Sequence, residues 1–85
     1  MTVEFTKNFI KQSKKLSPKL RVQVFQRIKL FTKEPLNPLL RDHQLKGKYK
    51  RYRSIDITGD FRALYFLEID KAIFDIVGTH SQLYG

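Results

Sequence analysis

The pattern of apolar and polar residues changes along the chain, and each change marks a new kind of element. Thr2 to Thr6 alternates as a short strand. A first helix is predicted to open at Thr6 or Lys7 and to end before Ser17-Pro18. Ser17 can cap a second helix, and Pro18 suits the first position of that helix.

The second helix is predicted from about Pro18 to Lys33. Its apolar residues recur at spacings of four, four and three, which is typical of one helix face. Pro35 and Pro38 end this helix and impose an extended linker. The apolar positions are Leu20, Val24, Ile28 and Phe31.

From Tyr49 onward the pattern becomes that of strands. Tyr49 to Ile57, Phe61 to Ile69 and Ala72 to Val77 are predicted strands, separated by turns at 58–60 and at Asp70-Lys71. Loops this short favour antiparallel hairpins. The predicted fold class is therefore α+β: a short N-terminal strand, two basic helices packed on one sheet, and a three-stranded antiparallel meander. We expect a single domain over residues 1–85.

Composition removes several classes of protein. The chain contains no cysteine, which excludes disulfides, thiolate zinc sites and cysteine nucleophiles. It shows no apolar signal core and no apolar run of transmembrane length, so we expect a cytoplasmic protein without a membrane partner. No spacing of Asp, Glu or His indicates a metal site, and no Gly-rich loop indicates a phosphate cradle. We therefore expect no cofactor.

The net charge of +9 is concentrated in one part of the chain. Residues 1–53 carry 15 Lys/Arg and 3 Asp/Glu, a balance of +12, whereas residues 54–85 carry 2 and 5, a balance of −3. Such an excess favours a polyanionic partner such as nucleic acid. A solvated basic helix surface that aids solubility is the alternative.

Arg62 stands out because it interrupts an otherwise apolar central strand. A charge at such a position must be paired or open to a groove. One interpretation is an ion pair with Asp60, Asp56 or Glu68. The other is a phosphate clamp, since a guanidinium matches the geometry of a phosphate and keeps its charge.

His80 and His43 are candidates for proton transfer, because histidine titrates near neutral pH. A loop histidine is more often a surface residue than a catalyst, so both interpretations stay open. RNA cleavage needs no metal: the 2′-hydroxyl can attack the adjacent phosphate if the protein supplies a base, an acid and a cation.

Three segments resemble the RelE toxin superfamily, and especially its YafQ branch. Asp42-His43-Gln44-Leu45-Lys46-Gly47 is similar to an Asp-His-x-Leu-x-Gly element of that branch. Residues 59–65 resemble the central-strand signature of the superfamily, and residues 78–85 resemble the YafQ-type tail, Gly-Thr/Ser-His-x-x-Leu-aromatic. Residues 1–41 match only in the order of elements and in basic character.

The resemblance implies a ribosome-dependent mRNA endonuclease that is neutralised by a cognate antitoxin, with which it can form a hetero-oligomer. His80 would be the general acid, Arg62 would hold the scissile phosphate, and Asp60 and His43 would be base or orienting groups. Tyr84 would stack on a nucleotide or orient it. The residues expected to contact mRNA or ribosomal RNA in the A site are Lys46, Lys48, Lys50, Arg51 and Arg53.

One residue departs from the family pattern. Asp56 stands where YafQ-type enzymes often have a further histidine, and a carboxylate cannot replace a histidine as a cationic acid. Either Asp56 serves as a base or as an orienting group, or the activity is weaker or differently balanced, and the base stays unassigned. Two alternatives to the nuclease also stay open: a ParE-like toxin that inhibits DNA gyrase without cleaving RNA, and a non-toxic basic nucleic-acid-binding protein.

Overall fold

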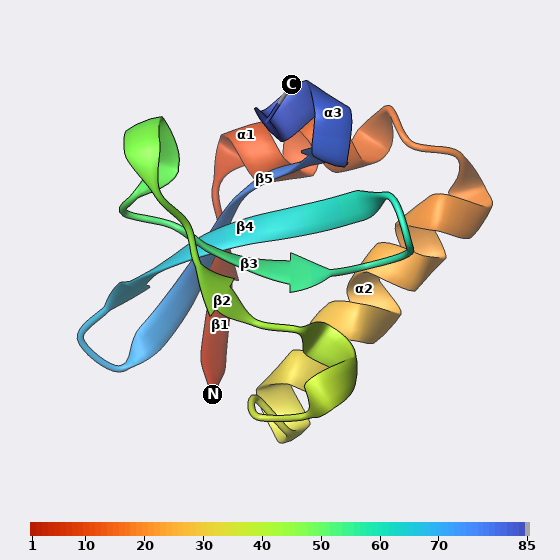
Figure 1. Cartoon of the computed structure of the whole chain (residues 1–85). Helices are drawn as coiled ribbons and strands as arrows, with labels where there is room; N and C mark the ends of the chain where they lie inside the picture. The colour runs from red at the N-terminus through yellow and green to blue at the C-terminus, as the bar shows by residue number, and fades with distance from the viewer. Residues whose placement is uncertain (85) are drawn as a thin grey trace.

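The computed structural model describes residues 1–84, with the side chain of Tyr84 outside the description. The chain forms a mixed five-stranded sheet in the order β1-β5-β4-β3-β2, in which β1 is parallel to β5 and the other neighbours are antiparallel (Figure 1). The α+β class is confirmed. The strands are β1 (Thr2–Phe5), β2 (His43–Gln44), β3 (Arg53–Asp56), β4 (Phe61–Glu68) and β5 (Lys71–Thr79).

Residues 1–84 also form three α-helices and two 3₁₀ turns: α1 (Lys7–Lys14), α2 (Pro18–Lys33), η1 (Pro38–Leu40), η2 (Gly47–Tyr49) and α3 (His80–Tyr84). Ser17 caps α2 as predicted, and Thr6 caps α1. The hydroxyl of Thr6 accepts a hydrogen bond from the Phe9 amide, and the hydroxyl of Ser17 accepts one from the Leu20 amide. Capping by Ser or Thr satisfies amides that a helix leaves without partners in its first turn.

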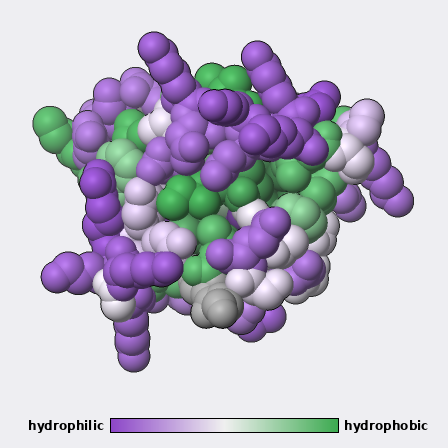
Figure 2. Space-filling model, turned by 90° about the horizontal axis from the view of Figure 1, so that it is seen from above, coloured by the Kyte–Doolittle hydropathy of each residue, from purple (hydrophilic) through white to green (hydrophobic). Residues whose placement is uncertain are grey.

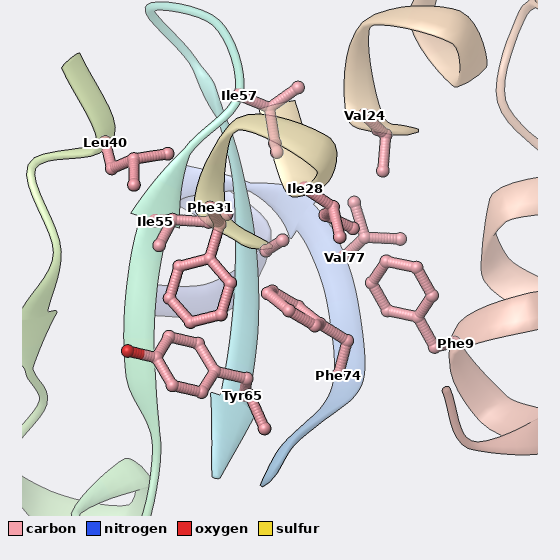
Figure 3. Close-up of a cluster of buried hydrophobic side chains, with 12 residues drawn as sticks. Phe9, Val24, Ile28, Phe31, Leu40, Ile55, Ile57, Tyr65, Phe74 and Val77 are labelled. Atoms are coloured by element: carbon pink, nitrogen blue, oxygen red, sulfur yellow. The ribbon is translucent and has the colours of Figure 1, made fainter. Parts of the chain in front are cut away.

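The main core lies between the two longer helices and one face of the sheet, as predicted. Phe9 of α1 and Phe31 of α2 pack against Phe74, at ring-centroid distances of 5.9 and 5.6 Å (Figure 3). All three side chains are at most 1% exposed. Their burial ties both helices to β5 and leaves the opposite face of the sheet for other contacts.

Several predicted boundaries are wrong. Residues 49–52 were expected in a strand, but η2 and a turn occupy 47–51, and the strand begins at Arg53. Gly47 has a φ of 66°, a left-handed conformation that glycine adopts without strain, and it starts this turn. The second hairpin turns at Ile69-Asp70 instead of Asp70-Lys71. Strand β2 and helix α3 were not predicted, because both are very short.

A β-bulge in β5 redirects one acidic side chain. Leu64 pairs with Ile76 and Tyr65 pairs with Phe74, so Asp75 is the extra residue between the two pairs. Its carboxylate accepts hydrogen bonds from the hydroxyls of Tyr52, at 2.6 Å, and of Thr6, at 2.7 Å. Asp75 therefore joins the start of α1 to the segment that precedes β3.

We expect Tyr52→Phe to lower the free energy of unfolding by about 1.5 kcal/mol, the net value of a hydrogen bond to a charged group. Burial, and then the hydrogen bond to Asp75, raises the pKa of Tyr52 from 10.0 to about 12. Because the pKa of Tyr52 is higher in the folded state than in the unfolded state, the stabilisation from its hydrogen bond to Asp75 is complete below pH 10. This stabilisation is lost as the pH rises toward 12. Urea titrations of both proteins between pH 7 and 12 measure the effect. Identical alkaline profiles would contradict it.

Candidate active site

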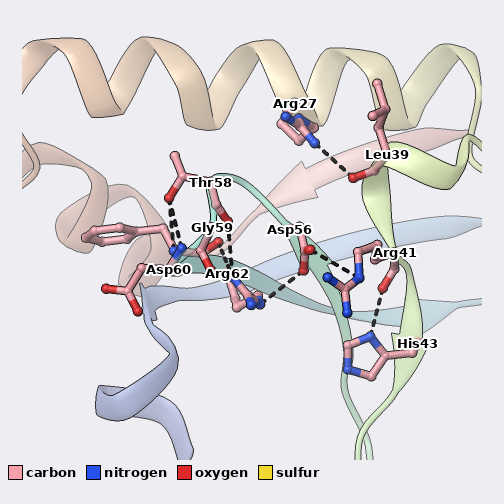
Figure 4. Close-up of polar contacts among 10 residues, drawn as sticks. Arg27, Leu39, Arg41, His43, Asp56, Thr58, Gly59, Asp60 and Arg62 are labelled. Carbon is pink, nitrogen blue, oxygen red and sulfur yellow. Dashed lines mark hydrogen bonds and ion pairs between the residues drawn. The ribbon is translucent and has the colours of Figure 1, made fainter.

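Arg62 and Asp56 form an ion pair on the sheet face opposite to the two long helices. They are direct cross-strand partners in β4 and β3, and Arg62 Nε lies 3.0 Å from Asp56 Oδ1. Each side chain is only 14% exposed. Arg62 Nη1 also donates to the carbonyl oxygens of Thr58, Gly59 and Phe61, at 3.1, 3.2 and 3.2 Å (Figure 4). The ion pair that the sequence offered as one interpretation is therefore present, with Asp56 as the partner.

These contacts fix the guanidinium in one orientation. Its Nε and Nη1 atoms are engaged by the protein, and Nη2 has no hydrogen-bond partner among residues 1–84. Because these protein contacts hold the guanidinium rigidly, its Nη2 edge is pre-organised to bind a further anion. The ion pair and the phosphate clamp are thus compatible roles for one side chain.

Asp56 also contacts a second arginine. Arg41 Nε lies 3.6 Å from Asp56 Oδ2, although the Arg41 side chain is 77% exposed. Arg41 has a φ of 45°, so the chain turns sharply there in a left-handed conformation that is uncommon for a residue with a side chain. Each oxygen of Asp56 therefore faces one guanidinium, which favours the orienting role over the role of base. Sequence reasoning did not single out Arg41.

His43 has a defined tautomer when it is neutral. Its Nδ1 lies 2.8 Å from the carbonyl oxygen of Arg41. Because a carbonyl oxygen only accepts hydrogen bonds, Nδ1 must carry the proton, which leaves the Nε2 lone pair available. His43 is exposed and pairs with Ser54, two residues before Asp56, so it shares the sheet face of Asp56 and Arg62. This arrangement fits a general base.

His80 was expected in a loop, but it is the first residue of α3. Thr79 and Gln82 cap this helix reciprocally: the Thr79 hydroxyl accepts from the Gln82 amide at 3.1 Å, and Gln82 Oε1 accepts from the Thr79 amide at 2.9 Å. The spacing Thr-x-x-Gln is a capping box and was the sequence signal for the missed helix. The His80 amide donates to the carbonyl of Asp60 at 2.8 Å, so His80 lies beside the β3–β4 turn.

Asp60 is exposed in that turn, and Figure 4 shows its carboxylate on the side of the turn away from Asp56. Phe61 pairs with Thr79 and Arg62 pairs with Gly78, so Asp60, Arg62 and His80 lie at the same end of the sheet. The role predicted for Tyr84 concerns a side chain outside the described part of the structure.

The predicted RNA-binding residues lie in two different parts of the structure, the segment 46–51 and the helix-side face of the sheet. Lys46, Lys48, Lys50 and Arg51 are exposed on the segment 46–51, which we call the basic loop. In this loop Arg51 stacks over the ring of Phe66, 4.2 Å from its centroid. Arg53 lies apart from them.

Arg53 instead belongs to the helix-side face of the sheet. It pairs across the strands with Tyr65, and its Nε lies 2.8 Å from Asp42 Oδ1. Tyr65 donates to the other oxygen of Asp42. Burial, and then this hydrogen bond, raises the pKa of Tyr65 above its ordinary value of 10.0. Asp42 therefore anchors β3 and β4 at the core and is not placed with Arg62 and His43.

Two other kinds of feature are absent from residues 1–84. In the described part of the chain no group of three or more His, Asp or Glu side chains is placed to hold a metal ion. No helix within residues 1–84 is long and apolar enough to cross a membrane.

Comparison with known proteins connects this geometry to a family. The family model described as "bacterial toxin of type II toxin-antitoxin system, YafQ" matches residues 1–85. The mRNA interferase toxin YafQ of Escherichia coli K12 is 35% identical over 51 residues, which cover 60% of this chain and 55% of that protein. The matched segment thus spans about half the length of that relative.

Solved structures agree over the whole chain. The crystal structure of YafQ from E. coli BL21(DE3) has a TM-score of 0.77 and 25% identity, and the alignment covers 98% of this chain and 97% of that one. A copper-bound mutant toxin from Helicobacter pylori has a TM-score of 0.67 and 30% identity, with 99% of both chains covered. The chain therefore belongs to the YafQ family of bacterial toxins from type II toxin–antitoxin systems.

Proposed function

We propose that this toxin is an endoribonuclease that cleaves mRNA in the A site of the bacterial ribosome and so arrests translation in the cytoplasm. The observation that carries the proposal is the cation held rigidly at Arg62, with His43 on the same sheet face and the backbone of His80 joined to the β3–β4 turn that Arg62 contacts. Membership of the YafQ family supports it, and so does the name of the E. coli relative as an mRNA interferase.

The proposed reaction needs only groups of the chain and of the RNA. His43 Nε2 takes the proton of the 2′-hydroxyl, and the 2′-oxygen attacks the adjacent phosphorus. The bond from phosphorus to the 5′-oxygen breaks, and that oxygen takes a proton from His80. Arg62 offsets the negative charge that develops on the phosphate. The products are a 2′,3′-cyclic phosphate and a 5′-hydroxyl.

In this proposal the basic loop binds the RNA and takes no part in the cleavage step. Its lysines at 46, 48 and 50 are exposed, so they suit contacts with the phosphates of mRNA and ribosomal RNA. Arg51 is stacked on Phe66 and can present its guanidinium plane to a nucleotide.

We further propose that a cognate antitoxin neutralises the toxin by covering basic and apolar surface. Val22 and Phe25 on α2 are 55% and 39% exposed, and Arg21 and Lys29 flank them around an apolar hollow of about 400 Å³. An acidic partner with apolar side chains fits this combination.

Expression in a bacterial host tests the proposed function. We expect protein synthesis to stop before DNA synthesis, with cuts in translated mRNA. The matched control is the same reporter mRNA with its start codon removed, which should stay intact because it carries no elongating ribosomes. DNA damage with intact mRNA would instead indicate a gyrase inhibitor, and the absence of both effects would indicate an inert binding protein. Either result would contradict the proposal.

A further inference from the structure

A groove of about 620 Å³ runs along β5 between α1, α3 and the basic loop. Its floor is apolar and its rim is polar. Figure 2, which views the molecule from above Figure 1, shows apolar residues gathered in the centre of this face with hydrophilic side chains around them. The apolar and aromatic lining residues are Leu16, Tyr49, Phe61, Ile76, Val77 and Leu83, and the polar ones are Asn8, Gln12, Lys15 and Gln82.

Gln12 lines the groove with an amide whose orientation is fixed. Strand β1 pairs with β5 only as far as Phe74, so the following part of β5 has an open edge. Gln12 Oε1 accepts the amide of Val77 at 2.8 Å and so replaces the missing strand partner. With the oxygen engaged, Gln12 offers its Nε2 hydrogens as donors for a ligand.

Gln82 is arranged in the same way from the other side of the groove. Its Oε1 accepts the Thr79 amide in the capping box at 2.9 Å, which leaves Nε2 as the donor. Glycine at position 78 lets the Gln82 side chain lie close to the backbone of β5, because a Cβ there would make a tight contact of 3.1 Å with Gln82 Oε1. The two glutamines are therefore both held by the backbone as donors.

Asn8 has the opposite hydrogen-bonding role, because it presents an acceptor to the groove. Its Nδ2 donates to the carbonyl of Asp75 at 2.8 Å, so its Oδ1 is left as an acceptor. The groove thus combines two fixed donors, one fixed acceptor, an apolar floor and the aromatic rings of Tyr49 and Phe61. A planar heterocycle that presents a carbonyl next to an N–H matches this combination.

We propose that the groove binds a keto-bearing base, guanine or uracil, of the RNA substrate and sets the sequence preference of cleavage. Guanine offers O6 beside N1–H, and uracil offers O4 beside N3–H. Adenine and cytosine offer an amino group where the glutamines need an acceptor. Aromatic stacking and edge contacts of this kind are how proteins read unpaired RNA bases.

The groove lies beside the proposed cleavage site. The inference that it sets the sequence preference of cleavage rests on the proposed function. Gln82 follows His80 by two residues in α3, and Tyr49 is part of the basic loop. A base in the groove therefore belongs to a nucleotide close to the scissile phosphate, where His80 would protonate the leaving 5′-oxygen. Lys15 on the rim can contact the phosphate of that nucleotide.

Gln82→Glu tests the inference most sharply. A glutamate keeps one oxygen for the Thr79 amide but presents a second acceptor to the groove in place of a donor. We expect the preference for guanine or uracil over adenine and cytosine next to the cut to fall by about 10-fold, since one base-edge contact typically discriminates by that factor or more. Sequencing of the cleavage products of one mRNA with the two proteins measures this.

Gln26→Glu is the matched control. It makes the same change of charge on an exposed glutamine of α2, outside the groove. We expect it to lower the rate at all sites equally and to leave the sequence preference unchanged. An unchanged preference in Gln82→Glu, or an equal change in both variants, would overturn the inference.

Binding of free nucleotides separates this inference from the proposed function, because it does not depend on cleavage. In NMR titrations with guanosine, uridine, adenosine and cytidine monophosphates, we expect the first two to shift the amides of Gln12, Val77 and Gln82 at lower concentration. Equal shifts from all four, or shifts confined to the basic loop, would exclude base recognition in the groove. A wild-type protein that binds guanosine monophosphate there but cleaves no RNA would contradict the proposed function alone.

Discussion

Arg62→Ala should lower the rate of RNA cleavage by about 10²–10³-fold, the usual effect of removing a charge that stabilises a transition state. The reason lies in how the guanidinium is held. Asp56 engages Nε, and three carbonyl oxygens of the β3–β4 turn and of Phe61 engage Nη1. The remaining edge can therefore meet the phosphate without reorganisation. Single-turnover cleavage at saturating RNA measures the loss.

Arg62→Ala can lower stability as well as catalysis, because among residues 1–84 it leaves the exposed Arg41 as the one ion-pair partner of Asp56. Arg62→Lys keeps the charge and should recover only part of the rate, since an ammonium lacks the planar geometry of the guanidinium. Arg53→Ala is the matched control. It breaks the ion pair with Asp42 on the helix-side face of the same strands.

We expect Arg53→Ala to unfold at lower urea than wild type and yet to cleave RNA at close to the normal rate when folded. If Arg53→Ala and Arg62→Ala lost activity to the same extent and in proportion to their loss of stability, Arg62 would have a structural role only.

His80→Ala should lower the cleavage rate by about 10²–10⁴-fold, the range typical of a lost general acid. The first position of α3 holds the backbone of His80 against Asp60, and the imidazole is exposed to a substrate. Ser81→Ala is the control, because Ser81 is exposed on the same short helix. We expect it to cleave normally.

A modified substrate distinguishes an acid from a residue that only shapes the site. If sulfur replaces the 5′-oxygen at the scissile bond, the leaving group departs as a thiolate and needs no proton. His80→Ala should then cleave this RNA at nearly the wild-type rate. A defect equally large on both substrates would show that His80 does not supply the proton to the leaving group.

The arrangement of helices and sheet could be predicted from the sequence because it depends on long repeating patterns. The apolar positions of α2 recur over sixteen residues, and Phe31 and Val24 are buried as that pattern requires. Strand β2 covers only two residues, and its pairing with β3 depends on contacts far apart in the chain. No local pattern of that length can indicate a strand.

The candidate site could be predicted in part. Arg62 was recognisable because a charge in an apolar strand needs a partner, and Asp56 was among the partners considered. The contribution of Arg41 could not be anticipated, since it depends on a left-handed turn that brings this residue to β3. The separation of Arg53 from the basic loop follows from the late start of β3, which places Arg53 on the helix-side face.

In the proposed reaction the chain itself supplies the acid, the base and the cation for cleavage by the 2′-hydroxyl of the RNA. Mass spectrometry of the fragments released from ribosome-bound mRNA by the purified protein tests it most directly. We expect upstream fragments that end in a 2′,3′-cyclic phosphate and downstream fragments that begin with a 5′-hydroxyl. Fragments with a 3′-hydroxyl and a 5′-phosphate would show that water, and not the 2′-hydroxyl, attacks the phosphorus, and would rule out the proposed reaction.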